Sequence, residues 1–146
     1  MSILKIKKLR DDAKIPKRAT TGSAGMDLYA CIDDEIEIKK HEIKLIPTGI
    51  SIALEDERYV ALIYARSGLA IKHGIAPANC VGVIDSDYRG EVCVGLTNFS
   101  NEPYVIKKDE RIAQMVISPV ELPEILEVEE LDDTERSNGG FGSTGK

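Results

Sequence analysis

The chain has 146 residues, with 19 lysines and arginines against 25 aspartates and glutamates, so its formal net charge is −6. This length favours one domain with a hydrophobic core of its own. The acidic balance argues against stable nucleic-acid binding, which needs cations to replace phosphate counterions. The sequence shows no apolar run near the ~20 residues of a membrane-spanning helix and no apolar signal core at its start. We therefore expect a cytoplasmic protein that does not insert into membranes.

The cysteine pattern excludes two common classes of small protein. The chain has three cysteines, an odd number, and no two of them form a CxxC pair. Neither a disulfide framework nor a structural zinc site is therefore indicated. We expect Cys31, Cys80 and Cys93 to be small buried apolar side chains.

Short runs with period-two alternation predict an all-β fold. They are rich in Val, Ile and Tyr, and turn signals such as Pro47-Thr48-Gly49 separate them. Many short strands at this spacing favour a sandwich or a barrel. In chain order the runs are residues 36–39, 59–64, 81–84, 92–94, 104–106 and 112–117.

Two segments depart from the strand pattern. Residues 67–74 predict one short helix, with Ser67 as its N-cap and Gly74 as its C′ residue. Residues 123–131 are rich in glutamate and suit either a helix or a strand, and we predict an edge-type strand there.

The last ten residues, 137–146, form a separate zone with four glycines and one large apolar side chain, Phe141. Such a composition favours a disordered tail when the tail stands alone. Phe141 is then either incidental or part of a flap that becomes ordered when it has a surface to cover.

Three segments carry candidate chemistry, and each has a structural alternative. Arg66, Ser67 and Gly68 at the start of the predicted helix suit an anion site, or an ordinary N-cap with a surface arginine. Asp27 lies between apolar residues and suits either a partner for a core cation or an anchor for metal-bound water. In residues 111–116 we expect Arg, Ala and Gln on one strand face, which is usually a solvated face.

The segment Val83–Gly90 ends an apolar strand with two carboxylates, an aromatic ring and a glycine. Turn chemistry explains these residues as a β-hairpin turn. Alternatively, Asp85 serves as a general base for water and Tyr88 as a stacking surface.

Five motifs in order resemble those of the homotrimeric dUTP pyrophosphatases. They are AGMDLYA at 24–30, ARSGLA at 65–70, VGVIDSDYRGEV at 81–92, RIAQMV at 111–116 and RSNGGFGSTG at 136–145. The resemblance spans nearly the whole chain. It implies a jelly-roll-like β-sandwich or distorted barrel with one short helix after Ser67, in a homotrimer with an exchanged C-terminal arm. Residues 1–135 would form the β domain, and 136–146 a flexible lid over the active site of a neighbouring subunit.

The resemblance also implies an activity. The family hydrolyses dUTP to dUMP and pyrophosphate with Mg²⁺, which keeps uracil out of DNA and supplies dUMP for thymidylate synthesis. By resemblance, Asp85 would activate the water that attacks the α-phosphorus, and Tyr88 would pack against the deoxyribose and exclude a 2′-hydroxyl. Asn79, Val83 and the backbone around Cys93 would line the uracil slot, and Ile84 is a further substrate-binding residue that the resemblance implies.

The remaining implied roles concern the triphosphate and the lid. Asp27 would contact the magnesium ion through water. Phe141 would close over the uracil, and Arg136 would meet the γ-phosphate. The other residues implied near the phosphates are Arg66, Ser67, Gly68, Gln114, Gly142 and Ser143.

Three positions depart from the family pattern. Ala65 stands where the family often has Pro, Asp109-Glu110 replaces the usual Gly-Asp, and Ser137 replaces a common Gly. None of these removes a functional side chain. Two other functions stay open from the sequence: a dCTP deaminase of related fold, and a nucleotide-binding protein without turnover. The apolar and amide character of the uracil-slot residues opposes the first, because deamination requires an acid–base group near the cytosine C4.

Overall fold

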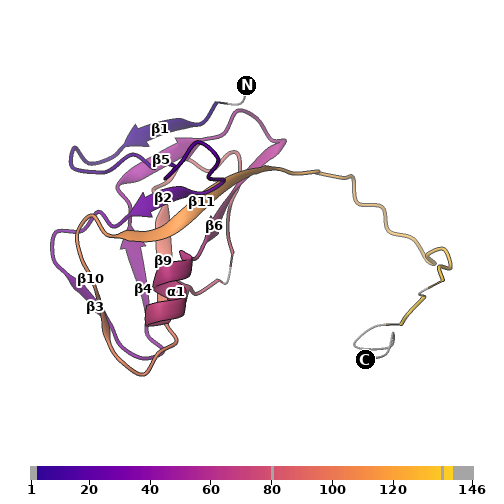
Figure 1. The fold of residues 1–146 in the computed structure, drawn as a ribbon. Coiled ribbons are helices and arrows are strands. Elements are labelled where there is room, and N and C mark those ends of the chain that lie inside the picture. The colour runs from indigo at the N-terminus through magenta and orange to yellow at the C-terminus, as the bar shows by residue number, and fades with distance from the viewer. Residues whose placement is uncertain (1–2, 80, 136, 140–146) are drawn as a thin grey trace.

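The computed structural model describes residues 3–79, 81–135 and 137–139, which contain eleven strands and one helix (Figure 1). The elements are β1 (Lys5–Lys8), β2 (Met26–Tyr29), β3 (Ile36–Ile38), β4 (Ile43–Pro47), β5 (Ile50–Ala53), β6 (Tyr59–Tyr64), α1 (Ser67–His73), β7 (Ile75–Pro77), β8 (Gly82–Ile84), β9 (Cys93–Asn98), β10 (Tyr104–Ile106) and β11 (Arg111–Pro119).

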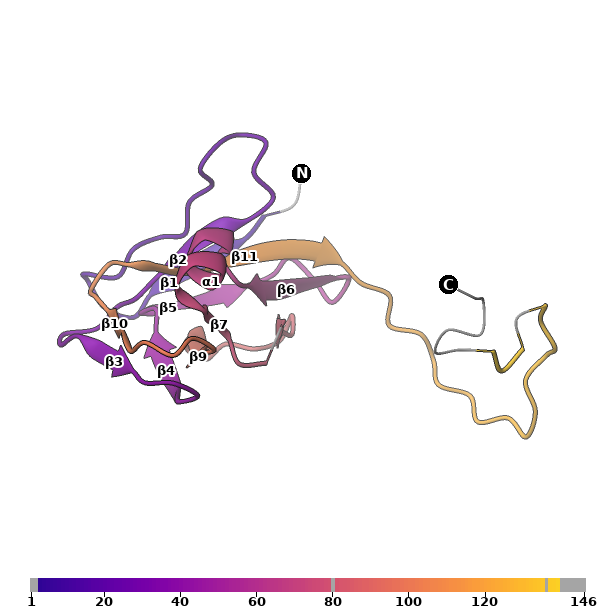
Figure 2. The ribbon, with the colours of Figure 1, turned by 60° about the horizontal axis from the view of Figure 1, so that its bottom comes forward.

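The strands form four antiparallel sheets. The largest has the order β2-β11-β6-β8, a second has the order β4-β9-β7, and β1-β5 and β3-β10 are two-stranded. Figure 2 shows β2, β11 and β6 on one side of the body and β3, β4 and β9 on the other. The expectation of a β-sandwich with one short helix is therefore confirmed, and the sheets do not close into a barrel.

The core lies between these layers and follows the alternation of the strands. On β9, for example, Val94 and Leu96 are buried, while Gly95 between them is partly exposed. This is the pattern of a sheet with one face toward the core. The large apolar side chains that are essentially fully buried are Leu28, Ile38, Ile46, Ile50, Ile75, Val92, Leu96, Ile106, Ile112 and Met115.

The predicted helix forms, with one difference at its start. Gly74 ends it with a left-handed backbone (φ 68°), and its N–H donates to carbonyl oxygens of the last turn. The N-cap is Arg66 instead of Ser67, and no side chain caps the helix there. The cap prediction at Ser67 was therefore wrong, and the Ser67 hydroxyl is exposed to solvent.

Two other expectations about the backbone were wrong. Residues 123–131 form no strand and run as an extended arm away from the sheets (Figure 1). The segment after Val83 is also not a regular two-stranded hairpin, because β8 pairs with β6 whereas β9 pairs with β4 and β7. That segment instead leads from one sheet to another through a turn.

The arm carries large apolar side chains that the described part of the chain leaves mostly exposed. Ile125 is 95% exposed and Leu131 is 85% exposed. Exposed apolar side chains in a row are unusual on the surface of a monomer.

The cysteine prediction holds in part. Cys31 is buried and free, whereas Cys93 is free and only partly buried. Cys80 lies outside the described residues. Among the elements that are described, no helix has the length and apolarity needed to cross a bilayer.

Candidate active site

One group of predicted site residues lies where β6 ends and α1 begins. Asp27 on β2 accepts a hydrogen bond at Oδ1 from Nε of Arg66, at 2.9 Å. Its Oδ2 lies 3.3 Å from Nη1 of Arg111 on β11. Arg66 Nη1 also donates to the carbonyl oxygen of Arg111 at 3.3 Å. The alternative that Asp27 pairs with a cation is therefore confirmed, and two arginines share its carboxylate.

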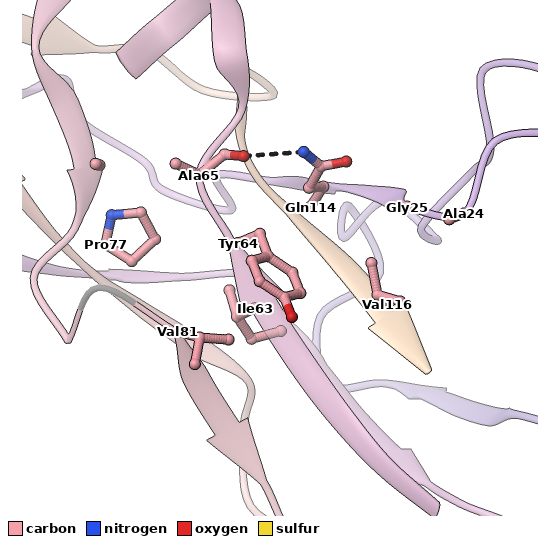
Figure 3. Close-up of a pocket in the computed structure, with 10 residues that line it drawn as sticks. Ala24, Gly25, Ile63, Tyr64, Ala65, Pro77, Val81, Gln114 and Val116 are labelled. Atoms are coloured by element: carbon pink, nitrogen blue, oxygen red, sulfur yellow. Dashed lines mark hydrogen bonds between the residues drawn. The ribbon is translucent and has the colours of Figure 1, made fainter. Parts of the chain in front are cut away.

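Gln114 joins this group from β11. Its Nε2 donates to the carbonyl oxygen of Ala65 at 2.9 Å, directly before Arg66 (Figure 3). Gly25 leaves room for it, because a Cβ at position 25 would lie only 3.1 Å from Cδ of Gln114 and closer still to its Oε1. The group therefore depends on a close approach between β2 and β11.

A β-bulge on β11 decides which side chains face this group. The register against β2 shifts between Arg111 and Ala113, and such a bulge changes the direction in which side chains point. Arg111 is exposed and Gln114 is partly exposed, but Ile112 and Ala113 are both buried. The expectation that Ala113 shares a face with Arg111 and Gln114 was therefore wrong.

An apolar cavity of about 460 Å³ borders this group (Figure 3). Gln114 and Ala65 form one side of it, and Tyr64 and Val81 contribute the side chains nearest the viewer. Ser67 and Gly68 lie beside it in the first turn of α1, both exposed. We call Asp27, Arg66, Ser67, Gly68, Arg111 and Gln114 the arginine cluster.

The second group surrounds the turn after β8. A cavity of about 360 Å³ is lined by Asp85 and Tyr88 together with apolar side chains. Asp85 is exposed, and its carboxylate makes no hydrogen bond or ion pair with the described part of the chain. We call the lining residues of this cavity the carboxylate pocket; they are Leu45, Val83, Ile84, Asp85, Tyr88, Glu91, Val92 and Cys93.

The loop from Asp85 to Glu91 is closed by its own hydrogen bonds. The N–H of Tyr88 donates to the carbonyl oxygen of Asp85 at 3.2 Å. Tyr88 Oη donates to the carbonyl oxygen of Glu91 at 3.0 Å. Arg89 Nη1 donates to the carbonyl oxygens of Ser86 (2.7 Å) and Tyr88 (2.9 Å). The loop is therefore a compact turn that places Tyr88 beside Asp85.

Two further predicted residues, Asn79 and Cys93, lie in different surroundings. Asn79 is exposed, and its Nδ2 lies 3.2 Å from the point where a Cβ of Gly82 would be. Cys93 lines the pocket, and burial raises the pKa of its thiol, with a further contribution from the nearby Glu91. A raised pKa keeps the thiol protonated and weakly reactive near neutral pH.

Four predicted residues lie outside the described part of the chain: Arg136, Phe141, Gly142 and Ser143. All three departures from the family pattern lie inside it, and two of them have a left-handed backbone. Asp109 has φ 64° and Ser137 has φ 43°, and both stand where the family commonly has glycine. A left-handed backbone at these positions explains why glycine suits them.

Sequence reasoning missed three residues of these groups. Arg111 belongs to a recognised motif, but its contact with Asp27 depends on the β-bulge, and no sequence pattern predicted that bulge. Leu45 on β4 lies outside every motif and reaches the carboxylate pocket only through the packing of two sheets. Glu91 was within a motif but looked like an ordinary strand residue; its Oε1 accepts from the N–H of Gly49 at 2.8 Å.

Comparison with known proteins places this geometry in a family. The sequence profile of the dUTPase family matches residues 11–145. The chain belongs to the dUTPase family. A deoxyuridine 5′-triphosphate nucleotidohydrolase of Nautilia profundicola is 59% identical, over 98% of this chain and 99% of its own. One of Hydrogenobaculum is 52% identical, over 97% of each chain.

A solved structure also resembles this dUTPase. The dUTPase of Staphylococcus bacteriophage 80alpha, solved with dUpNHpp, superposes with a TM-score of 0.88 at 30% identity and covers 99% of both chains. The similarity therefore extends over nearly the whole chain.

Proposed function

We propose that this protein hydrolyses dUTP to dUMP and pyrophosphate at a site built from the arginine cluster and the carboxylate pocket. The observation that carries this proposal is the exposed Asp85 carboxylate, which has no hydrogen bond or ion pair among the described residues and lines a pocket together with Tyr88. Membership of the dUTPase family and the nucleotide analogue bound to the phage relative both support it.

The two groups lie apart in one chain. Ile84 pairs with Ala61 near the start of β6, whereas Gln114 pairs with Tyr64 at its end. Ala61 and Tyr64 are three residues apart on β6, which places the two pairs about 10 Å apart along the strand. Asp85 follows Ile84 directly, and Arg66 lies two residues after Tyr64. Because β8 and β6 are antiparallel, the chain runs from these two positions toward opposite ends of the sheet. The two groups also line different cavities.

This separation supports a site shared between copies. We propose that the carboxylate pocket of one copy faces the arginine cluster of the next, in a closed homotrimer that gives three equal sites. In a closed cyclic assembly every subunit makes the same head-to-tail contact with the next one, so every interface site is complete. The exposed apolar arm supports the same assembly, because a neighbouring copy would cover it.

The chemistry assigned to each side follows from its charge. Water is a weak nucleophile, and the free carboxylate of Asp85 can accept its proton as it attacks the α-phosphorus. The bond from that phosphorus to the bridging oxygen then breaks, and pyrophosphate leaves. Arg66 and Gln114 would bind phosphate oxygens, because guanidinium and amide N–H groups suit them. Ser67 and Gly68 would add contacts beside Arg66.

The carboxylate pocket would hold the nucleoside. Val83, Ile84 and Cys93 offer an apolar slot, and Asn79 would reach the uracil from its position beside Gly82. Tyr88 would pack on the deoxyribose and leave no room for a 2′-hydroxyl. Arg136 would meet the γ-phosphate and Phe141 would cover the uracil, with Gly142 and Ser143 near the phosphates. Residues 136–146 would thus act as a lid on the β domain of residues 1–135.

The described residues fit a loosely held magnesium ion. They contain no group of three or more side chains able to ligate a metal, and both oxygens of Asp27 contact arginines. Mg²⁺ keeps several waters and often takes only one or two carboxylates together with substrate phosphates. When bound, such an ion neutralises phosphate charge, and Asp27 would hold one of its waters.

We further propose that the protein works in the cytoplasm, where it keeps uracil out of DNA and supplies dUMP.

The test measures pyrophosphate release from dUTP, dTTP, dCTP and UTP, with and without Mg²⁺, for the wild type and for Asp85→Asn. The proposal requires release from dUTP alone that needs Mg²⁺ and that the substitution abolishes. Ammonia release from dCTP would replace it with deamination. Binding of dUTP without turnover by the folded wild type would show that the fold serves binding only.

A further inference from the structure

Gly90 has a backbone that does not require glycine. Its φ lies outside the left-handed range, unlike those of Gly49 and Gly74. An L-residue would therefore meet no backbone strain at this position. The atoms around position 90, and not its backbone conformation, therefore explain the glycine.

One side chain lies nearest to this position. A Cβ at position 90 would lie 2.6 Å from Cζ of Tyr88, 3.0 Å from Cε2, and closer still to Oη. These distances are shorter than carbon atoms tolerate without displacement. All three nearest atoms belong to the Tyr88 ring, so the ring occupies the space that a side chain at position 90 would need.

The Tyr88 ring is held over Gly90 by a hydrogen bond. Its Oη donates to the carbonyl oxygen of Glu91, the residue after Gly90, at 3.0 Å. Glu91 is itself fixed, because its Oε1 accepts from the N–H of Gly49 at 2.8 Å. On the other side of the loop, Arg89 donates to the carbonyl of Tyr88. The Tyr88 ring therefore contacts a stretch of loop backbone that hydrogen bonds hold on both sides.

We propose that Gly90 is a positioning residue that sets the selection of deoxyribose over ribose by allowing Tyr88 to lie close against the Gly90–Glu91 backbone. This inference rests on the proposed function, in which Tyr88 meets the sugar. Tyr88 is 45% exposed and faces the carboxylate pocket beside Asp85. A ring displaced from the loop backbone would change the space at the sugar's 2′ position, where one oxygen atom distinguishes UTP from dUTP.

The experiment compares Gly90→Ala with Gly22→Ala. A Cβ at Gly22 would meet nothing within 4 Å, and its φ is also outside the left-handed range, so this variant controls for the loss of a glycine. For each protein, kcat/KM is measured with dUTP and with UTP. We expect the dUTP-to-UTP ratio to fall by about tenfold or more in Gly90→Ala, the scale on which a small change in a pocket alters selection. In Gly22→Ala it should stay at the wild-type value.

Tyr88→Phe provides the second arm of the test. It removes the hydroxyl that anchors the ring without adding an atom, so it should also lower the ratio. Adding Gly90→Ala to Tyr88→Phe should then lower the ratio less than Gly90→Ala does in the wild type, because the two changes act on one ring. An unchanged ratio in Gly90→Ala, or equal effects in both backgrounds, would overturn the proposal.

A spectroscopic readout separates this inference from the proposed function. The chain has five tyrosines, and labelling them with ¹³C at Cζ lets Tyr88→Phe identify the Tyr88 signal. That signal should shift in Gly90→Ala and stay in place in Gly22→Ala, in the absence of nucleotide. A shift in a protein that does not hydrolyse dUTP would refute the function and retain the Gly90–Tyr88 contact. No shift in an active enzyme would refute the positioning role alone.

Discussion

Asp27 and Arg66 form an ion pair of 2.9 Å although 39 residues separate them in the chain. The pair is partly shielded, since the side chain of Asp27 is 15% exposed and that of Arg66 is 26% exposed. Arg111 contacts the other oxygen of the same carboxylate. Asp27 therefore constrains the direction of two guanidinium groups.

The first prediction concerns this carboxylate. Asp27→Asn removes the charge that holds Arg66 and Arg111, so kcat/KM for dUTP should fall. A charge-assisted hydrogen bond contributes about 1.5–3 kcal/mol, which corresponds to a loss of about ten- to a hundredfold. Steady-state pyrophosphate release measures it. Asp56→Asn is the matched control, because Asp56 pairs with Arg58 on the exposed surface. Equal activity in the two variants would contradict the assignment of Asp27.

The second prediction tests whether one site uses two copies. Asp85→Asn and Arg66→Gln should each be inactive as purified homotrimers. When the two variants are unfolded together at equal amounts and refolded, random assembly gives about a quarter of the sites an intact Asp85 and an intact Arg66. Activity should therefore return to roughly a quarter of that of refolded wild type.

The control for this mixing experiment is the double variant. Asp85→Asn/Arg66→Gln, mixed with either single variant, leaves no site with both groups intact and should stay inactive. If the mixture of the two single variants also stays inactive while it forms trimers, both residues would have to serve the same site from one chain.

The sequence predicted most of this fold because the strands alternate strongly. The runs at 36–39, 59–64 and 104–106 became β3, β6 and β10, since each presents apolar side chains to one core. The same reasoning gave a wrong prediction, an edge strand, for residues 123–131. Their apolar side chains are mostly exposed within the described part of the chain, so periodicity within the segment did not determine a structure there.

The motifs located the candidate site but not its geometry. The contact between Arg111 and Asp27 depends on the bulge at Arg111–Ala113, where strict alternation fails. The carboxylate pocket depends on Leu45, which reaches it from another sheet. Contacts between segments far apart in the chain follow from packing, and a pattern along one strand contains no information about them.

The third prediction concerns Asp109, which stands where the family usually has glycine. Asp109→Gly relieves a left-handed backbone (φ 64°), which costs about 1 kcal/mol or more in an L-residue. It also loses the exposed ion pair with Lys14, which contributes about 0–1 kcal/mol. The free energy of unfolding in urea should therefore rise slightly or stay constant. Asp109→Ala loses the pair without relieving the backbone and should be the less stable of the two, at equal protein concentration.

The fourth prediction concerns Tyr104, whose pKa is raised to about 12 by burial and by its hydrogen bond to Glu110. An ordinary tyrosine titrates near pH 10, so the contact stabilises the fold fully below that pH. The stabilisation is lost as the pH rises from about 10 through 12. Absorbance at alkaline pH should show one late-titrating tyrosine that is missing in Tyr104→Phe. A titration curve of Tyr104→Phe that keeps the late component would contradict this assignment.

The last prediction concerns the arm, whose side chains at Ile125 and Leu126 are 95% and 81% exposed in one chain. If a neighbouring copy covers them, each contributes about 1.5–3 kcal/mol to assembly, and Ile125→Ser/Leu126→Ser should weaken the trimer by several orders of magnitude in its association constant. Light scattering across a dilution series measures this. Glu127→Gln, on the same arm, is the control and should assemble as the wild type does. A variant that stays trimeric at every dilution would show that other surfaces hold the subunits together.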